Sequence, residues 1–141
     1  MGTLIEKVKK FFTLRTNIDE IKIKRDTINK IIDLSRETHP KEFLAFFDGI
    51  IGPEVIITDI FYQPYIANNR SAFARLDIPL TTRTLGSIHS HPGPRNTPSS
   101  ADRTFFRKSG LVHAIIGYPY REEDVAFYNH HGEQINVTII N

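Results

Sequence analysis

Two histidines and an aspartate lie in one short stretch of this sequence, in an order that could bind a metal ion. His89 and His91 are separated by a single residue, and side chains two residues apart in a β-strand project from the same face. The segment 92–98 is rich in Pro and Gly and can fold back, which would bring Asp102 beside the two imidazoles as an oxygen ligand. The spacing therefore predicts a metal site with three protein ligands.

Three protein ligands and one open position are typical of a catalytic zinc ion, whereas structural zinc sites are closed by four ligands. A water molecule in the open position would have its pKa lowered to about 7, which supplies hydroxide at neutral pH. The chain has no cysteine, so thiolate zinc sites and cysteine nucleophiles are excluded. The pattern thus favours hydrolysis by a zinc-activated water.

Hydrolysis of this kind also needs a group that transfers protons and a donor for the oxyanion. Glu42 is the candidate general acid and base, because a carboxylate can take the water proton and then protonate the leaving amine. It precedes an apolar run at 43–47, where we expect burial to raise its pKa. Ser99 lies three residues before Asp102, on the same side of the first helical turn, and is the candidate oxyanion donor. These two residues also form a Ser-x-x-Asp capping pattern, which is compatible with catalysis.

Strands and helices must position these residues, and the apolar periodicity predicts where they lie. Alternating or β-branched runs predict strands at 21–24, 42–47, 55–62, 72–78, 84–89, 111–117, 124–128 and 135–140. Helical spacing predicts helices at 3–13, between the caps Asp26 and Thr27 and the breaker Pro40, and at 99–108. Asp48-Gly49 is a turn signal, which predicts a hairpin between the second and third strands. The fold class is α/β (α+β), a mixed β-sheet flanked by helices.

The length and composition indicate one compact domain. With 141 residues, 40% of them hydrophobic, the chain can build a single core. Charged residues interrupt the first apolar positions and no apolar run approaches about 20 residues, so neither a signal peptide nor a membrane span is expected. We therefore expect a cytoplasmic protein with no membrane partner. A formal net charge of +2 is too small to indicate a nucleic-acid partner.

The spacing of the chemical residues resembles the signature of the JAMM (MPN+) zinc metalloproteases. That signature is His-x-His, seven residues, Ser, two residues and Asp, with a Glu upstream, and the residues that fill it here are Glu42, His89, His91, Ser99 and Asp102. The stretches 36–44 and 69–73 also resemble segments of the family. The resemblance covers roughly residues 28–128 and is to a small prokaryotic or archaeal-type member.

This resemblance implies a cytidine-deaminase-like fold and a role for each residue of the signature. It implies zinc ligation by His89, His91 and Asp102. It implies that Glu42 is the general acid and base, and that Ser99 stabilises the tetrahedral intermediate. It further implies cleavage of peptide or isopeptide bonds after the C-terminal tail of ubiquitin or ubiquitin-like proteins.

The resemblance also frames the domain organisation and the alternatives. We expect an amphipathic N-terminal extension over residues 1–20 and a JAMM/MPN domain over residues 21–141. A substrate tail would lie extended beside a strand edge near 72–78. One alternative is a zinc hydrolase that processes sulfur-carrier proteins or small peptides. Another is a non-catalytic binding scaffold, which would be expected to lack ligands, although none is missing here.

Overall fold

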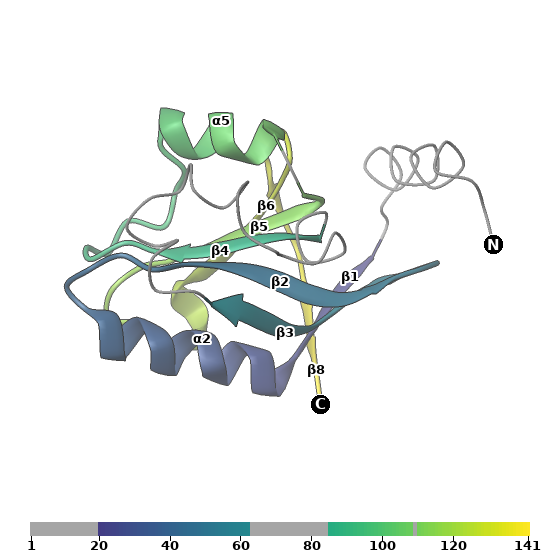
Figure 1. The fold of residues 1–141 in the computed structure, drawn as a ribbon, viewed down its shortest axis with the longest axis horizontal. Helices are drawn as coiled ribbons and strands as arrows, with labels where there is room; N and C mark the ends of the chain where they lie inside the picture. Colours follow the sequence, from purple (N-terminus) through teal and green to yellow (C-terminus); the bar gives the residue numbers. More distant parts are fainter. Residues whose placement is uncertain (1–19, 63–84, 109) are drawn as a thin grey trace.

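The computed structural model describes residues 20–62, 85–108 and 110–141, and it contains one mixed sheet with helices on both faces (Figure 1). The predicted helix at 3–13 and the predicted strand at 72–78 lie outside the described residues. In chain order the elements are β1 (Ile21–Lys24), α2 (Arg25–Thr38), β2 (Leu44–Ile51), β3 (Val55–Tyr62), β4 (Gly86–Ser90), α5 (Ser100–Lys108), β5 (Val112–Ile116), the short 3-10 helix η2 (Glu122–Asp124), β6 (Val125–Asn129), β7 (Gln134–Ile135) and β8 (Thr138–Ile140).

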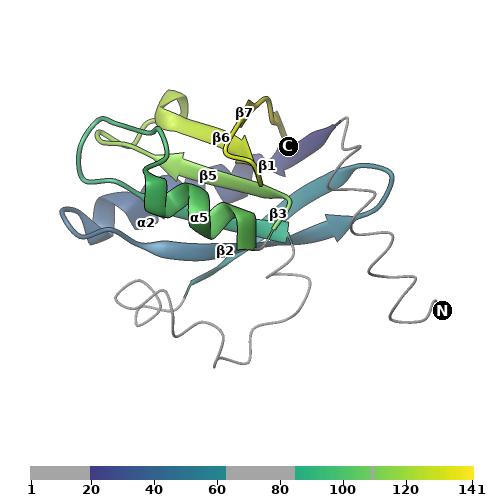
Figure 2. The same cartoon turned by 90° about the horizontal axis from the view of Figure 1, so that it is seen from above.

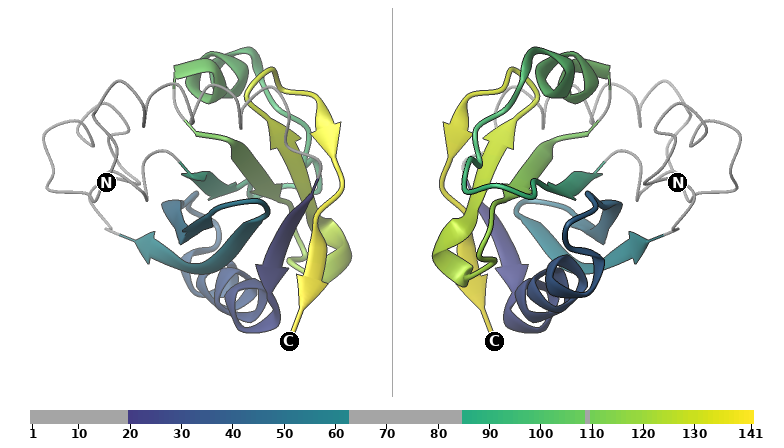
Figure 3. Two further views of the ribbon diagram at one scale, coloured as in Figure 1. Left: turned by 90° about the vertical axis from the view of Figure 1, so that its right-hand side faces the viewer. Right: turned by 90° about the vertical axis from the view of Figure 1, so that its left-hand side faces the viewer.

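The sheet is strongly curled, so that its two edges approach each other (Figure 3). Its strand order is β7-β6-β5-β4-β2-β3-β1-β8, which places β7 and β8 at opposite edges. Only Asn136 and Val137 connect these two strands, and so short a connection spans only about 10 Å. The prediction of one strand over 135–140 is therefore wrong, because β7 pairs with β6 whereas β8 pairs with β1 on the other edge.

Strands β2 and β3 form the predicted antiparallel hairpin, but its turn lies elsewhere. Asp48 and Gly49 lie inside β2, where the pairing register shifts at a β-bulge. The chain turns after β2 instead, where the amide of Gly52 donates to the carbonyl of Glu54 at 3.2 Å. A Cβ at Gly49 would lie 2.0 Å from the carbonyl oxygen of Ile56. The glycine at this position thus allows the two strands to approach closely and does not form a turn.

The two long helices cover opposite faces of the sheet, and each buries an apolar stripe. Figure 2 shows α5 in front of the sheet and α2 behind it. Helix α2 packs Ile28 and Ile31 into the main core, and α5 packs Phe106 against Ile115 of β5. Helix α2 ends at Thr38, before Pro40, as the sequence predicts. No helix of the described segments is long and apolar enough to cross a membrane.

The predicted cap of α2 at Asp26 and Thr27 is wrong. The helix begins at Arg25, directly after β1, and its N-cap residue Lys24 makes no side-chain capping hydrogen bond. Asp26 lies in the first turn instead, where a negative charge interacts favourably with the helix dipole. Because β1 and α2 are contiguous, burial of Ile23 and Ile28 fixes the start of the helix.

Candidate metal centre

Strand β4 lies inside the sheet and presents the two histidines. It pairs antiparallel with β2 on one side and parallel with β5 on the other. His89 lies within the strand and is fully buried, and His91 follows its last residue. The amide of His91 donates to the carbonyl of Ile116 at 2.9 Å, which continues the pairing with β5. Pairing on both sides gives the two imidazoles a fixed backbone.

The first turn of α5 carries the third side chain, Asp102. The amide of Ser99 donates to Oδ2 of Asp102 at 2.9 Å, and the amide of Asp102 donates to the Ser99 hydroxyl at 3.1 Å. These two bonds are a reciprocal capping box, which confirms the predicted Ser-x-x-Asp cap. The Asp102 side chain is buried, and the hydrogen bond from the Ser99 amide holds one of its carboxylate oxygens.

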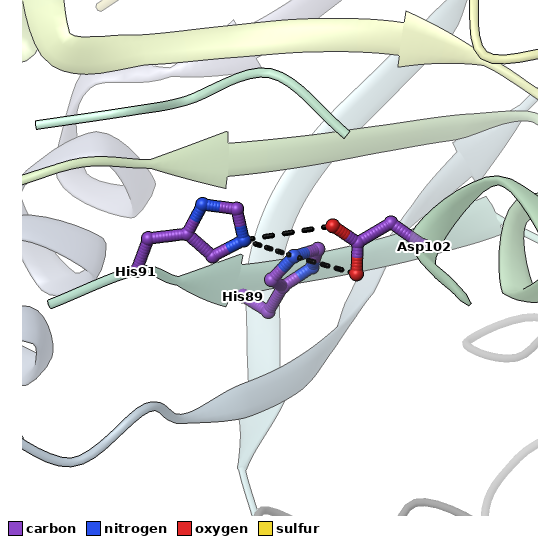
Figure 4. A group of neighbouring side chains, drawn as sticks. All are labelled: His89, His91 and Asp102. Atoms are coloured by element: carbon purple, nitrogen blue, oxygen red, sulfur yellow. Dashed lines mark hydrogen bonds and ion pairs between the residues drawn. The ribbon is translucent and has the colours of Figure 1, made fainter. Parts of the chain in front are cut away.

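The three side chains converge on one point, as Figure 4 shows. Nε2 of His89 lies 3.2 Å from Nε2 of His91 and 3.3 Å from Oδ1 of Asp102. Nε2 of His91 lies 3.5 Å from Oδ2 of Asp102. Two ligands of a tetrahedral zinc ion, each about 2.0–2.1 Å from the metal, lie about 3.3–3.4 Å apart. The triad therefore has the size of one face of a zinc tetrahedron and is consistent with zinc binding.

The loop between the histidines and α5 orients the His91 ring. Nδ1 of His91 lies 2.8 Å from the carbonyl oxygen of Arg95, so Nδ1 carries the proton and donates it. Nε2 is then the nitrogen with a free lone pair. It faces His89 and Asp102, as a metal-binding imidazole requires. The next carbonyl, that of Asn96, accepts a hydrogen bond from the Tyr128 hydroxyl at 2.7 Å. The Asn96 side chain donates to the carbonyl of Asp124 at 3.0 Å, which also holds this loop.

The electrostatics of the triad favour a cation. Burial of Asp102 opposes its ionisation, but hydrogen bonds from His89, His91 and the Ser99 amide outweigh burial and hold its pKa far below the usual range. The hydrogen bond to Asp102 raises the pKa of His91 against the lowering effect of burial, and the carbonyl of Arg95 and the charge of Glu42 raise it further. The carboxylate therefore stays ionised, and the surroundings of His91 stabilise a positive charge. Such an environment would also stabilise a divalent cation.

Glu42 lies beside this centre but is not buried. It is exposed and precedes β2, which begins only at Leu44. The prediction that Glu42 is buried at the edge of a strand is therefore wrong, because the apolar run that follows it is buried and Glu42 itself lies in the connection from α2. Burial and the neighbouring Tyr118 raise the pKa of Tyr120, and the charge of Glu42 adds to this rise. The same charge makes the smallest of the contributions that raise the pKa of His91. Glu42 and the triad thus share one region of the molecule.

Ser99 also lies at the centre, and its hydroxyl has capacity left for a further bond. It is exposed and accepts the hydrogen bond from the amide of Asp102 with its oxygen. A hydroxyl that accepts one bond still carries its own hydrogen. Ser99 can therefore cap α5 and still donate toward a neighbouring oxyanion.

Several residues that orient the centre have no signal in the sequence. Tyr128 and Tyr120 each donate to a main-chain carbonyl near the histidines, the second to that of His91 at 3.3 Å. Tyr120 is buried and has a positive φ of 67°. Each tyrosine lies far along the chain from its partner, so no local spacing rule indicates these contacts.

Known proteins resemble this chain in sequence and in fold. A family model described as prokaryotic homologs of the JAB domain matches residues 24–130. A protein of Haloferax volcanii named as a probable metalloprotease is 33% identical over 127 residues, which are 84% of this chain and 78% of that protein. The residues matched by the family model include β4, the loop after it and α5, and therefore the whole triad.

Solved structures agree with these matches. A JAB1/MPN domain protein from Archaeoglobus fulgidus superposes with a TM-score of 0.69 and 28% identity, covering 85% of this chain and 99% of that one. A structure described as a metalloprotease-like zinc site of the JAMM type in the proteasome and signalosome gives a TM-score of 0.67 and 26% identity, covering 86% and 99%. A solution structure from Desulfitobacterium hafniense, 14% identical with a TM-score of 0.56, covers 86% and 93% and shares the fold alone.

Proposed function

This chain belongs to the family of prokaryotic JAB-domain homologues, and we propose that it hydrolyses peptide or isopeptide bonds after the C-terminal tail of ubiquitin-like proteins. The single observation that carries the hydrolytic part of this proposal is the triad, whose three ligand-to-ligand distances of 3.2, 3.3 and 3.5 Å fit zinc. The Haloferax volcanii relative supports metalloprotease chemistry by its name. The choice of a ubiquitin-like tail rests on the family resemblance.

In this proposal His89, His91 and Asp102 would hold the zinc ion. Bound there, zinc supplies a Lewis acid that acidifies water and polarises the scissile carbonyl group. The fixed Nδ1–H of His91 keeps its Nε2 directed at the site, and the capping box keeps the Asp102 carboxylate there. The described residues supply three protein ligands, which would leave one position for a solvent molecule, as a catalytic zinc site requires.

Two further side chains complete the chemistry. Glu42 takes a proton from the attacking water and gives it to the leaving amine, a role for which an exposed carboxylate near the triad is suited. Ser99 donates its hydroxyl hydrogen to the oxyanion of the tetrahedral intermediate. A scaffold without activity would not need this complete set of residues, so we favour an enzyme.

A second candidate substrate shares the same site. A hydrolase that processes sulfur-carrier proteins or small peptides would use the same ligands and the same Glu42. Direct comparison of cleavage separates the two, with a ubiquitin-like protein, a sulfur-carrier protein and a short peptide each linked to a reporter. Faster cleavage of the ubiquitin-like fusion supports the proposal, whereas cleavage of the short peptide alone would favour the alternative.

The variant Glu42→Gln tests the mechanism. The amide cannot accept a proton, so we expect cleavage to fall by about 100-fold or more, while zinc content stays at the wild-type level. Glu37→Gln is the matched control, because Glu37 is an exposed glutamate at the end of α2 and should retain activity. Zinc content is measured by metal analysis and activity by release of the reporter. Wild-type activity in Glu42→Gln would exclude this role for Glu42.

A further inference from the structure

We propose that Glu42 is positioned against the metal ligands by two hydrogen-bonded anchors, one at the residue that follows it and one at His39, three residues before it. The first anchor joins Phe43 to Ser90, and the second joins His39 through Tyr120 to His91. This inference rests on the proposed function, since it concerns the geometry between Glu42 and the zinc site. Ser90 and Tyr120 are positioning residues in this account, because they act through Glu42 and contact no reacting atom.

The first anchor is a pair of hydrogen bonds between Phe43 and Ser90. The amide of Phe43 donates to the Ser90 hydroxyl at 3.0 Å, and the amide of Ser90 donates to the carbonyl of Phe43 at 3.1 Å. Both residues are 1% exposed. Ser90 lies between the two histidines and Phe43 directly follows Glu42, so this pair fixes the backbone of Glu42 to the strand that carries the ligands.

The second anchor passes through the hydroxyl of Tyr120. This hydroxyl donates to the carbonyl of His91 at 3.3 Å and lies 2.7 Å from Nδ1 of His39. Because a hydroxyl has one hydrogen, it accepts the second bond from the Nδ1–H of His39. His39 also stacks on Tyr118, with ring centroids 4.9 Å apart. The segment before Glu42 is thereby tied to the carbonyl of a proposed ligand.

The two anchors end on consecutive residues of the chain, Ser90 and His91. Glu42 lies outside β2 and is exposed, so sheet pairing and burial do not hold it directly. A general base must keep its position to well below about 1 Å to remain effective. Tyr120 has a positive φ of 67°, which is uncommon for a residue other than glycine. An unusual backbone that directs a buried hydroxyl to this junction is consistent with a positioning role.

The variant Ser90→Ala removes the side-chain bond of the first anchor and leaves its main-chain bond, whereas Tyr120→Phe removes the hydroxyl of the second anchor. Both variants keep the side-chain shape. We expect kcat to fall about 10-fold or more in each, while KM and zinc affinity stay within about two-fold of wild type. Ser87→Ala is the matched control, because it removes another buried hydroxyl of β4, one that lies 2.7 Å from Nδ1 of His113. This control should keep wild-type kcat, so any loss common to all three variants would reflect stability and overturn the inference.

A second measurement does not depend on activity. With Co²⁺ in place of zinc, the pseudocontact shifts of the amides of residues 41–43 report their position relative to the metal. We expect these shifts to change in Ser90→Ala and Tyr120→Phe, whereas those of β5 stay as in wild type. Tyr120→Phe keeps the ring in the core, so it decides the question should Ser90→Ala fail to fold.

The outcomes distinguish this inference from the proposed function. A wild-type chain that neither binds zinc nor cleaves any substrate contradicts the proposed function. A wild-type chain that cleaves, with variants that retain both kcat and the shifts of residues 41–43, contradicts the anchors alone. Loss of zinc affinity in parallel with kcat would also overturn the inference, because the variants would then act on the ligands and not on Glu42.

Discussion

A single carboxylate, that of Asp102, serves both the helix and the metal centre. Its Oδ2 accepts from the amide of Ser99 at 2.9 Å, and its Oδ1 lies 3.3 Å from Nε2 of His89. The cap therefore fixes the ligand, and both roles are compatible, as the sequence pattern predicts. The ionised state that the metal centre needs is also the state that best accepts hydrogen bonds at a helix N-terminus.

The variant Asp102→Asn separates these two roles. An asparagine oxygen can still cap the helix, so we expect the metal-free protein to keep its fold, although it loses the interactions of the carboxylate with His89 and His91. The negative charge and one oxygen are lost, so zinc affinity should fall by about 100-fold or more. Competition with a chelator measures affinity, and Asp59→Asn, an exposed carboxylate on β3, is the control. Unchanged zinc affinity in Asp102→Asn would contradict ligation by this residue.

The residues of the centre differ in how far the sequence predicts them. His89, His91 and Asp102 follow from strand periodicity and a local helix cap, and the structure brings them together. The surroundings of Glu42 do not follow, because its exposure depends on where α2 ends and where β2 starts. Local rules indicate which side chains share a face, whereas the burial of a residue in a connection depends on the packing of both neighbours.

Among the elements, the loop at 92–98 determines the orientation of His91. The Tyr128 hydroxyl donates to the carbonyl of Asn96, next to the carbonyl of Arg95 that receives Nδ1–H of His91. Burial raises the pKa of Tyr128, which keeps its hydroxyl protonated and able to donate at neutral pH. Strand β6 thus supports a ligand that is carried by the end of β4.

The variant Tyr128→Phe tests this support. The ring keeps its stacking on Phe106, with centroids 6.2 Å apart, so the fold should persist while the loop loses one bond. We expect zinc affinity to fall by about 10-fold, as for other outer partners of metal ligands. Chelator competition measures the affinity and circular dichroism checks the fold. Wild-type affinity in a folded Tyr128→Phe protein would show that the loop does not depend on this bond.

In the hairpin of β2 and β3, residue types that are typical of a turn form a β-bulge instead. Asp48-Gly49 predicts a turn, yet the pair forms a bulge where only glycine fits, because a Cβ at Gly49 would lie 2.0 Å from the carbonyl oxygen of Ile56. Small residues suit a turn and a close strand contact equally well. The sequence alone therefore does not distinguish a turn from a bulge. The difference depends on the pairing of β2 with β3.

The variant Gly49→Ala should destabilise the protein, by about 2–4 kcal/mol, because the added carbon overlaps backbone that the hairpin holds in place. Gly52→Ala in the same hairpin is the matched control, since its Cβ would meet only the carbonyl oxygen of Glu54 at 3.8 Å. Urea denaturation of both variants measures the difference. Equal stability of the two variants would contradict the close contact at Gly49.

At the scale of the whole molecule, the curled sheet gathers the proposed active residues. Strand β4 and the residue after it carry the histidines, and the connection into β2 carries Glu42. On one face, α5 carries Asp102, and Ser99 directly precedes this helix. The mixed sheet and the flanking helices follow from apolar periodicity. The curl does not, because it depends on β7 and β8 pairing at opposite edges with only two residues between them.

Removal of zinc should lower stability but leave the fold. The main core joins Ile23, Ile31, Phe47 and Ile57 without the triad, so the apo protein has its own driving force for folding. At a free zinc concentration about 100 times the Kd, binding would add about 2.7 kcal/mol. Thermal denaturation with and without a chelator should show a lower Tm and an unchanged far-ultraviolet spectrum. Unfolding on chelation would instead indicate a structural zinc site.

The most direct test of the account is a crystal structure of the zinc-loaded protein, with anomalous data at the zinc absorption edge. We predict one anomalous peak, bonded to Nε2 of His89, Nε2 of His91 and a carboxylate oxygen of Asp102, with bond lengths of about 2.0–2.2 Å and a solvent molecule in the fourth position. A peak bound elsewhere, no peak in a zinc-saturated crystal, or a fourth protein ligand closing the site would contradict a catalytic zinc centre in this chain.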